Sequence, residues 1–156
     1  MQNLTIRPMA LSDIKSCAQM VASTPLWQRY NVTLEGASAH LLAGLQSGAL
    51  MLVADDGEGN PLGFVWLAER GAFDRSGYIR WIAVTANRRS GGVGRQLLVA
   101  AEEHTRQRSG DIFLLCSDFN VDAQRFYERN GYDRVGALPD YVLIGVTELI
   151  YRKRLK

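Results

Sequence analysis

A glycine-rich segment, Arg89 to Gly94, most constrains what this chain can fold into. It reads Arg-Ser-Gly-Gly-Val-Gly and stands between an apolar, β-type run, Tyr78 to Val84, and a helical pattern that begins near Val93. At a strand-to-helix junction, small residues leave successive backbone N–H groups uncovered where the helix dipole is positive. The segment therefore predicts a strand, loop and helix that together bind a phosphate or pyrophosphate.

Two common phosphate loops do not fit this segment. A nucleoside-triphosphate loop needs Gly-Lys-Ser/Thr, but Gly94 is followed by Arg95 and Gln96. A dinucleotide fingerprint needs a third glycine three positions after Gly94, where Leu97 stands. What remains is Arg-x-x-Gly-x-Gly after a strand that ends in Val84. An ordinary tight turn has a similar composition, so the segment alone leaves both interpretations open.

A second motif follows the apolar run Asp111 to Cys116. Residues 120–132 read Asn-Val-Asp-Ala-Gln-Arg-Phe-Tyr-Glu-Arg-Asn-Gly-Tyr, and the Asn-Gly pair is typical of a helix C-terminus. Adjacent helical residues point about 100° apart, so Phe126 is expected to pack in the core while Tyr127 faces elsewhere.

Together the two motifs resemble the GNAT superfamily of N-acetyltransferases. The first is similar to its acyl-CoA pyrophosphate loop, and the second to its Asn-x-x-Ala-x-x-Phe-Tyr-x-x-x-Gly-Tyr/Phe signature, in the same order along the chain. The resemblance covers nearly the whole chain and implies one N-acetyltransferase domain over residues 1–156. It implies acetyl-CoA as the co-substrate and a primary amine of a small molecule as the acceptor, which attacks directly in a ternary complex.

Two alternatives stay open. The first is acetylation of a protein or peptide amine, which needs an open groove across the acceptor face. The second is a non-catalytic acyl-CoA-binding module, which would keep the glycine loop but tolerate loss of Tyr127.

The hydrophobic periodicities predict an α/β domain with a mixed sheet, in the order β-α-α-β-β-β-α-β-α-β-β. Helices are expected after Ser12, which can cap the first, from about Thr33, from Val93 to about Arg108, and from Asn120. Strands are expected at residues 4–7, 49–54, 62–69, 78–84, 111–116, 133–137 and 147–154. A right-handed crossover makes strands 78–84 and 111–116 parallel, and the resemblance implies that they splay apart to take the pantetheine arm of the cofactor.

The resemblance also assigns cofactor-binding residues. Backbone groups of three strand residues are expected to pair with pantetheine as an added strand would, with the Ile82 N–H nearest the thioester oxygen. Asn120 either hydrogen-bonds the pantetheine or caps the helix that it begins. The residues expected to bind the pyrophosphate are Arg89, Ser90, Gly91, Gly92, Val93 and Gly94, and those expected to pair with pantetheine are Ile82, Ala83 and Val84.

Tyr127 is the expected general acid, placed against the cofactor so that its hydroxyl protonates the departing thiolate. The general base is where this sequence departs from the family. Several members carry a glutamate near the start of the strand before the glycine loop, and the corresponding residue here is Tyr78. Water or another carboxylate, such as Glu69, Asp118 or Asp140, could take the proton, and the sequence names no base. His40 and His104 lie in apolar helical patterns and are interpreted as packed.

The acceptor is expected to meet the connection between the first two helices and the connection between the last two strands. The former carries Trp27, Arg29 and Tyr30, and the latter carries Tyr141. Loops with such residues often bind ligands. Alternatively, Trp27 and Tyr30 cover the core or the interface of a homodimer.

Composition bounds the remaining classes of function. The chain has 156 residues, 47% of them hydrophobic and 22% charged, which suits one soluble domain. A net charge of +2 is too slight to indicate nucleic acid, and the basic run from Tyr151 to Lys156 is interpreted as a solvated strand. Cys17 and Cys116 lack metal-ligand spacing, so we expect no metal and a reducing compartment. No leader or apolar span is recognised, and we expect a cytoplasmic protein that does not bind membranes.

Overall fold

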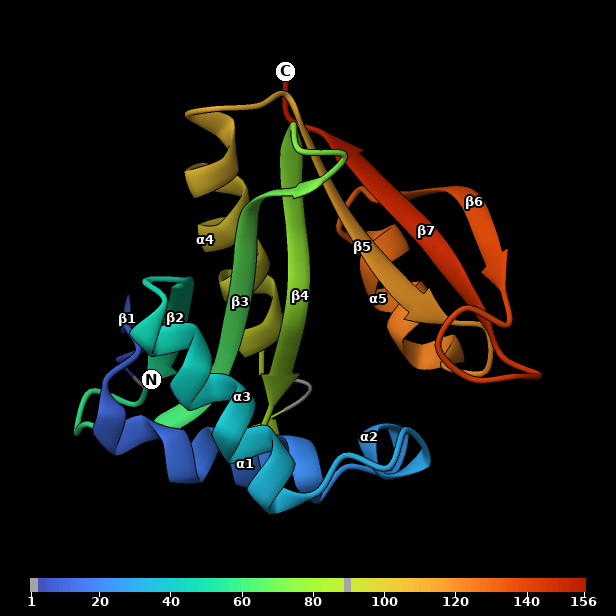
Figure 1. Cartoon of the computed structure of the whole chain (residues 1–156). Helices are drawn as coiled ribbons and strands as arrows, with labels where there is room; N and C mark the ends of the chain where they lie inside the picture. The colour runs from blue at the N-terminus through green and yellow to red at the C-terminus, as the bar shows by residue number, and fades with distance from the viewer. Residues whose placement is uncertain (1–2, 89–90) are drawn as a thin grey trace. The chain divides into compact units, whose positions relative to one another are not determined.

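The computed structural model describes residues 3–88 and 91–156 of the chain. Within them it has five α-helices and seven strands (Figure 1). The strands are β1 (Thr5–Pro8), β2 (Leu50–Asp55), β3 (Pro61–Ala72), β4 (Ser76–Val84), β5 (Asp111–Ser117), β6 (Asp133–Pro139) and β7 (Thr147–Arg154). The helices are α1 (Ile14–Ala22), α2 (Pro25–Arg29), α3 (Leu34–Gln46), α4 (Val93–Arg106) and α5 (Val121–Arg129), with 3-10 turns at Leu11–Asp13 and Ala86–Arg88.

The mixed sheet is confirmed. The strand order is β1-β2-β3-β4-β5-β7-β6. β4 and β5 run parallel, with residues 77–79 paired with residues 112–114. β2 is antiparallel to β1 and β3, and β7 is antiparallel to β5 and β6. The parallel pair joined through α4 is the arrangement that the strand, loop and helix predicted.

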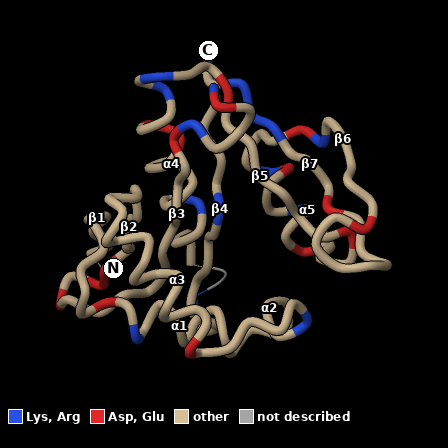
Figure 2. Tube along the Cα trace, viewed as in Figure 1, with Lys and Arg blue, Asp and Glu red and all other residues tan. Residues whose placement is uncertain are grey.

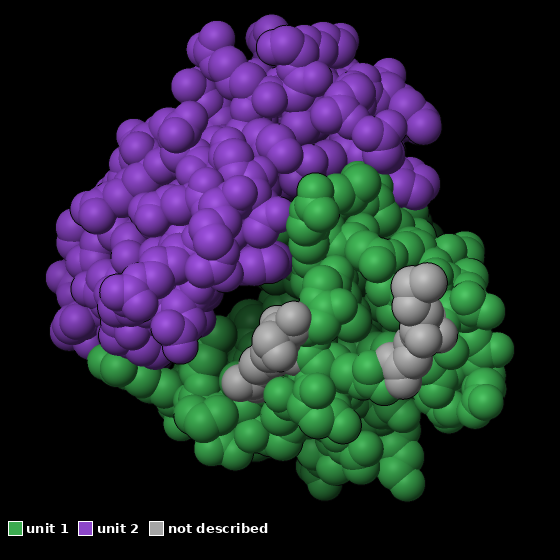
Figure 3. Space-filling view, turned by 180° about the vertical axis from the view of Figure 1, so that it is seen from behind, with its two compact units in different colours: residues 1–68, 80–101 green, residues 69–79, 102–156 purple. Residues whose placement is uncertain are grey.

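The chain divides into two compact units, coloured separately in Figure 3. The first unit comprises residues 1–68 and 80–101, and the second comprises residues 69–79 and 102–156. The boundary therefore passes through β3, β4 and α4.

Helices α1 and α3 pack over β2 and β3 in the first unit. Gly44 permits this packing, because a Cβ atom there would lie 2.8 Å from the Trp66 ring. The Thr33 side chain caps α3 by accepting a hydrogen bond from the Gly36 N–H at 3.0 Å. The side chains that are fully buried in this core include those of Cys17, Val21, Ala37, Leu41, Val53 and Phe64.

An ion-pair clamp joins β1 to its neighbours in the same unit. The Arg7 guanidinium lies 2.7 Å from Asp13 Oδ2 and 2.7 Å from Asp55 Oδ2, and both carboxylates are buried. Its hydrogen bonds hold the pKa of both carboxyl groups below their ordinary value. Asp55 also accepts hydrogen bonds from the N–H groups of Gly57 and Gly59, which fixes the turn between β2 and β3.

Helix α5 packs on the sheet of the second unit, formed by β5, β7 and β6 (Figure 1). Glu102 of α4 is buried there, and it accepts hydrogen bonds from the Tyr132 hydroxyl at 3.0 Å and from Lys153 Nζ at 2.9 Å. The basic run near the end of the chain is strand β7 and its continuation, seen in blue in Figure 2. The side chains of Tyr151 and Leu155 in this run are buried. The interpretation of the run as a solvated strand holds only in part, because the charged side chain of Lys153 reaches inward to Glu102.

The structure corrects three local predictions. Ser12 does not cap the first helix. It lies inside a 3-10 turn, where Asp13 accepts the hydrogen bond from the Ala10 N–H at 2.8 Å. His104, interpreted as packed, is only half-buried, because the buried face of α4 includes Leu98, Glu102 and Thr105 instead. The connection after α1 contains a short helix, α2, which begins at Pro25.

No helix in the described ranges is long and apolar enough to cross a membrane.

Candidate active site

The segment that leads into the glycine loop lies in the first unit, at the end of β4. The Thr85 N–H donates to the Leu62 carbonyl at 2.9 Å, and the Thr85 carbonyl accepts from the Arg88 N–H at 2.9 Å. These bonds place the 3-10 turn Ala86–Arg88 directly after the strand. Arg89 and Ser90, both predicted to bind the pyrophosphate, lie outside the described residues.

Gly91 and Gly92 lead into α4 and are exposed. Gly92 has φ +82°, a left-handed conformation that favours glycine. The Gly92 carbonyl accepts a hydrogen bond from the Gln96 N–H at 3.1 Å, and the helical hydrogen bonds continue from this pair onward. The N–H groups of Val93, Gly94 and Arg95 precede that bond, and an α-helix offers them no internal acceptor. The positive end of the α4 dipole therefore carries donors suited to a phosphate.

Close packing holds the end of β4 and the start of α4 together. A Cβ atom on Gly63 would lie 2.8 Å from the Ala83 carbonyl oxygen and 3.2 Å from Val93, so only glycine allows β3 to come this near. Thr85 adds an unused donor at the same place, because its buried Oγ1 has no hydrogen-bond partner among the described residues. Ile82, Ala83 and Val84 are half-buried. These features fit a cofactor that carries a pyrophosphate.

Asn120 and Tyr127 belong to the second unit, where Asn120 precedes α5. Its side chain accepts a hydrogen bond from the Ala123 N–H at 3.2 Å, so the capping interpretation is confirmed. Cys116 lies beside this turn, with its Sγ 3.9 Å from the Asn120 carbonyl oxygen. Burial raises the pKa of the Cys116 thiol to about 12.

Tyr127 is the buried member of the Phe-Tyr pair, with 8% of its surface exposed, whereas Phe126 is half-buried. The prediction that Phe126 is the one to pack in the core is therefore wrong. The physical reason is an aromatic cluster, since the Tyr127 ring lies 5.9 Å from that of Tyr132 and 6.0 Å from that of Tyr151.

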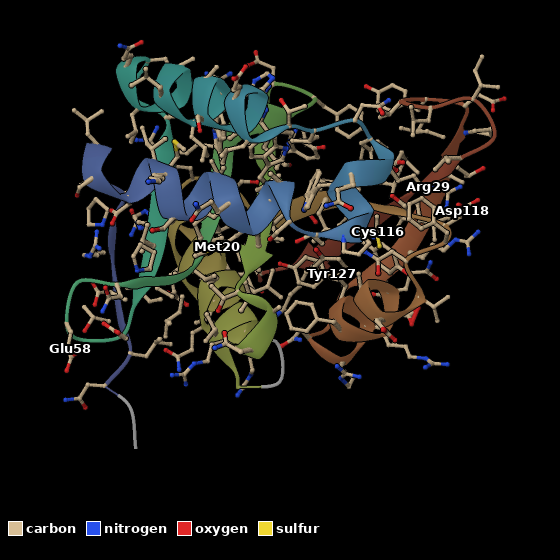
Figure 4. All side chains as sticks on the ribbon, turned by 90° about the horizontal axis from the view of Figure 1, so that it is seen from below. Met20, Arg29, Glu58, Cys116, Asp118 and Tyr127 are labelled. Carbon is tan, nitrogen blue, oxygen red and sulfur yellow. The ribbon has the colours of Figure 1, made fainter. Side chains whose placement is uncertain are left out.

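The hydroxyl of Tyr127 keeps its proton. Burial, with a smaller contribution from the neighbouring Cys116, raises the pKa of Tyr127 well above its ordinary value. Figure 4 shows Tyr127 and Cys116 close together in this unit. None of the described residues hydrogen-bonds the Tyr127 hydroxyl in the structure, so it is a neutral donor available to a ligand.

The carboxylates suggested as proton acceptors each have a structural partner. Glu69 pairs with Arg108 at 2.9 Å, Asp118 accepts from the Thr147 N–H at 3.3 Å, and Asp140 accepts from the Gly145 N–H at 2.6 Å. Sequence reasoning missed Glu148, an acid of β7 that is 6% exposed and faces Ser117 across the sheet. The signal was a glutamate at the head of the apolar run Leu149, Ile150 and Tyr151.

The predicted acceptor residues are placed separately in the two units. In the first, Trp27 and Tyr30 are half-buried with ring centroids 6.4 Å apart, and Arg29 is exposed. Trp27 also packs against Trp81 at 5.6 Å, a contact that sequence reasoning missed. His40 is exposed and touches the same ring at 5.8 Å, so its interpretation as a packed histidine is wrong.

Tyr141, in the second unit, is 63% exposed. It lies on a connection shaped by Asp140, whose φ is +55° and whose N–H donates to the Val146 carbonyl. Within the described ranges, no group of three or more His, Cys, Asp or Glu residues could hold a metal ion.

The model of the acetyltransferase (GNAT) family matches residues 14–132. The chain belongs to this family. It is 30% identical over 86 residues to a blasticidin-S acetyltransferase from Streptomyces morookaense, which covers 51% of this chain and 62% of the relative. The chain thus matches less than two thirds of the length of that relative.

Solved structures of family members agree with the fold. A nourseothricin acetyltransferase superimposes with a TM-score of 0.64 and 26% identity, over 69% of this chain and 66% of the other. An aminoglycoside 6'-N-acetyltransferase complexed with coenzyme A superimposes with a TM-score of 0.79 and 14% identity, over 97% of each chain.

Proposed function

We propose that this GNAT-family chain is one catalytic domain, residues 1–156, that transfers the acetyl group of acetyl-CoA to a primary amine of a small molecule. The observation that carries the proposal is the start of α4, where the exposed Gly91 and Gly92 precede the first helical N–H groups, which an α-helix does not bond internally. The relatives named for blasticidin, nourseothricin and aminoglycosides support a small-molecule acceptor.

We propose the cofactor roles separately for each unit. In the first unit, the loop residues 89–94 bind the pyrophosphate, and the backbone of residues 82–84 pairs with the pantetheine. Thr85 Oγ1, which has no partner among the described residues, is an additional donor at this place. In the second unit, the Asn120 carboxamide oxygen caps α5, which leaves its amide N–H groups to donate to the pantetheine.

Tyr127 supplies the proton for the leaving group. The neutral acceptor amine attacks the thioester carbon of acetyl-CoA, so that the C–N bond forms as the C–S bond breaks, and the departing thiolate takes the proton of the Tyr127 hydroxyl. The acceptor nitrogen gives its surplus proton to water, and water returns a proton to Tyr127. The raised pKa of Tyr127 keeps that proton in place at neutral pH. Trp27, Arg29, Tyr30 and Tyr141 are proposed to contact the acceptor.

Two measurements test this function. Acetyl-CoA at ~100 times its dissociation constant should add about 2.7 kcal/mol to the free energy of unfolding, which a melting curve detects, whereas NAD and ATP should not. Free thiol release should then follow addition of one of a panel of amines, namely blasticidin S, nourseothricin and an aminoglycoside. No stabilisation by millimolar acetyl-CoA would overturn the proposal.

We also propose a metal-independent protein that works in the cytoplasm. Cys17 and Cys116 are free and buried, and burial raises the pKa of each thiol to about 12, so both are unreactive thiols suited to a reducing compartment. Turnover should be unchanged by EDTA, and a loss of turnover that zinc or magnesium restores would contradict this point.

A further inference from the structure

Tyr127 lies among three aromatic rings of the second unit. Its ring centroid is 5.3 Å from that of Phe126, 5.9 Å from that of Tyr132 and 6.0 Å from that of Tyr151. The first two belong to the same contiguous motif as Tyr127, whereas Tyr151 comes from the middle of β7. Tyr151 is therefore the ring that a distant segment of the chain brings to this group.

The side chain of Tyr151 is fixed at both of its ends. Its backbone is in register with Leu114 of β5 on one side and with Arg134 of β6 on the other, so it belongs to an interior strand. Tyr151 is 1% exposed, and its hydroxyl donates a hydrogen bond to Glu128 Oε1 at 3.3 Å. Because Glu128 directly follows Tyr127 on α5, this bond joins the helix to the sheet at the turn that carries Tyr127.

The start of α5 is fixed to the end of β5 by separate bonds. Gln124 Nε2 donates to the carbonyl oxygens of Ser117 at 3.1 Å and Asp118 at 2.9 Å. The Asn120 N–H also donates to the Ser117 carbonyl, at 3.0 Å. These bonds hold the first turn of the helix, whereas the rotamer of a side chain in the next turn is set by the groups that pack against it.

The hydroxyl of Tyr127 is directed only by the packing of its ring, since it hydrogen-bonds none of the described residues. A general acid must lie within hydrogen-bond distance of the atom that it protonates, and a misplacement of about 1 Å can cost about 100-fold in rate. The orientation of the Tyr127 ring is thus a requirement of the proposed reaction. Tyr132 cannot set that orientation relative to the sheet by itself, because its N–H donates to the Tyr127 carbonyl at 3.0 Å within the same local segment.

We propose that Tyr151 is a positioning residue for the acetyl transfer, whose ring fixes the rotamer of Tyr127 and so directs the Tyr127 hydroxyl toward the departing thiolate. This inference rests on the proposed acetyltransferase function, in which Tyr127 is the acid. Tyr151 acts through Tyr127 alone, and it transfers no proton itself.

A double-mutant cycle tests this role, because a positioning residue matters only while the group that it positions is present. Tyr151→Leu removes the ring and keeps an apolar side chain, and it should be made in the wild type and in Tyr127→Phe. The kcat is measured with saturating acetyl-CoA and whichever panel amine is acetylated, where the chemical step limits the rate. We expect Tyr151→Leu to lower kcat about 10-fold in the wild type and less than about 2-fold in Tyr127→Phe. The KM for acetyl-CoA should stay within about 2-fold of its wild-type value.

Tyr151→Phe is the matched variant, because it keeps the ring and removes only the hydroxyl that binds Glu128. It should recover most of the kcat that Tyr151→Leu loses. If the leucine variant does not fold, Tyr151→Met takes its place in the cycle, since a methionine side chain fills irregular apolar gaps.

An equal fold-decrease of kcat in the two backgrounds would show a general structural effect and overturn the inference. An unchanged kcat in Tyr151→Leu would do the same, and so would a Tyr151→Phe variant no faster than Tyr151→Leu. In these cases a low kcat of Tyr127→Phe alone leaves the acetyltransferase function and its acid intact. Full turnover in Tyr127→Phe, or no turnover of any amine, would instead overturn the proposed function of Tyr127 or of the chain, and this inference with it.

Discussion

The Asn120 side chain accepts a hydrogen bond from the Ala123 N–H at 3.2 Å, and this bond closes the first turn of α5. It uses the carboxamide oxygen only. The two roles that the sequence left open for Asn120, a cap and a cofactor contact, therefore draw on different atoms and can be separated by substitution.

Asn120→Asp keeps the capping oxygen and removes the amide N–H donors. We expect its stability to match that of the wild type, whereas Asn120→Ala should lose about 1 kcal/mol in the free energy of unfolding by urea. If the amide N–H contacts pantetheine, both variants should bind acetyl-CoA more weakly by calorimetry. An Asn120→Asp variant with unchanged acetyl-CoA affinity would restrict Asn120 to its structural role.

Gly91 is the position at which to test the phosphate site by charge. Gly92 is unsuitable, because its φ of +82° makes any side chain there strained. Among the described residues, a Cβ atom on Gly91 meets only the Arg88 carbonyl oxygen, at 3.5 Å, which is ordinary contact. Gly91→Ala should therefore fold and bind acetyl-CoA normally, while Gly91→Asp should fold but bind at least about 10-fold more weakly, since its carboxylate repels the pyrophosphate. Equal affinity of the two variants would make the loop an ordinary turn.

The fold was largely predictable because its periodicities are regular. β7 was expected at residues 147–154 and is found there, and α5 follows the Asn120 cap as expected. The short helix α2 was missed because five residues carry no period, although Thr24 followed by Pro25 is a typical helix start. β3 and β4 are longer than predicted, because the turn between them is made by Phe73 and Asp74, two non-glycine residues with positive φ.

Candidate site residues could be assigned from the sequence only where they lie in a contiguous motif. The glycine loop and the α5 motif are such cases. Trp81 and His40 touch across two elements 41 positions apart in sequence, and no local pattern relates them. The choice of Tyr127 depends on its motif and stays a prediction, whereas its burial depends on Tyr132 and Tyr151, the second of which comes from a strand far from the motif.

The Arg7 clamp predicts how stability depends on pH. The pKa values of Asp13 and Asp55 are lowered in the folded protein, so their contribution to stability is complete above the unfolded pKa of about 3.9 and is lost as pH falls through the lower folded values. Asp13→Ala should cost about 3 kcal/mol, because it removes one partner of a buried ion pair. Urea unfolding at pH 7 and at pH 3 measures both effects. The variant should also lose less stability than the wild type on acidification, and an equal loss would contradict the assignment.

The proposed acid role of Tyr127 can be separated from its packing, because its hydroxyl binds none of the described residues while its ring packs against Tyr132 and Tyr151. Tyr127→Phe should keep stability and acetyl-CoA affinity, and should lower turnover about 100-fold, the lower end of the effect of a general acid, because a thiolate leaves readily. The decrease should appear in kcat, because Tyr127 is proposed to give its proton in the transition state.

Tyr132→Phe is the matched control, since it deletes a buried hydroxyl of the same cluster that binds Glu102 instead. It should lose about 1.5 kcal/mol of stability and keep its turnover. The pH dependence adds a further check. Because burial raises the pKa of Tyr127, the wild type should keep its turnover up to at least pH ~10, the ordinary pKa of tyrosine, without a loss caused by ionisation of this group. Unchanged turnover in Tyr127→Phe, measured where the chemical step limits the rate, would remove Tyr127 from the reaction and leave water as the proton donor.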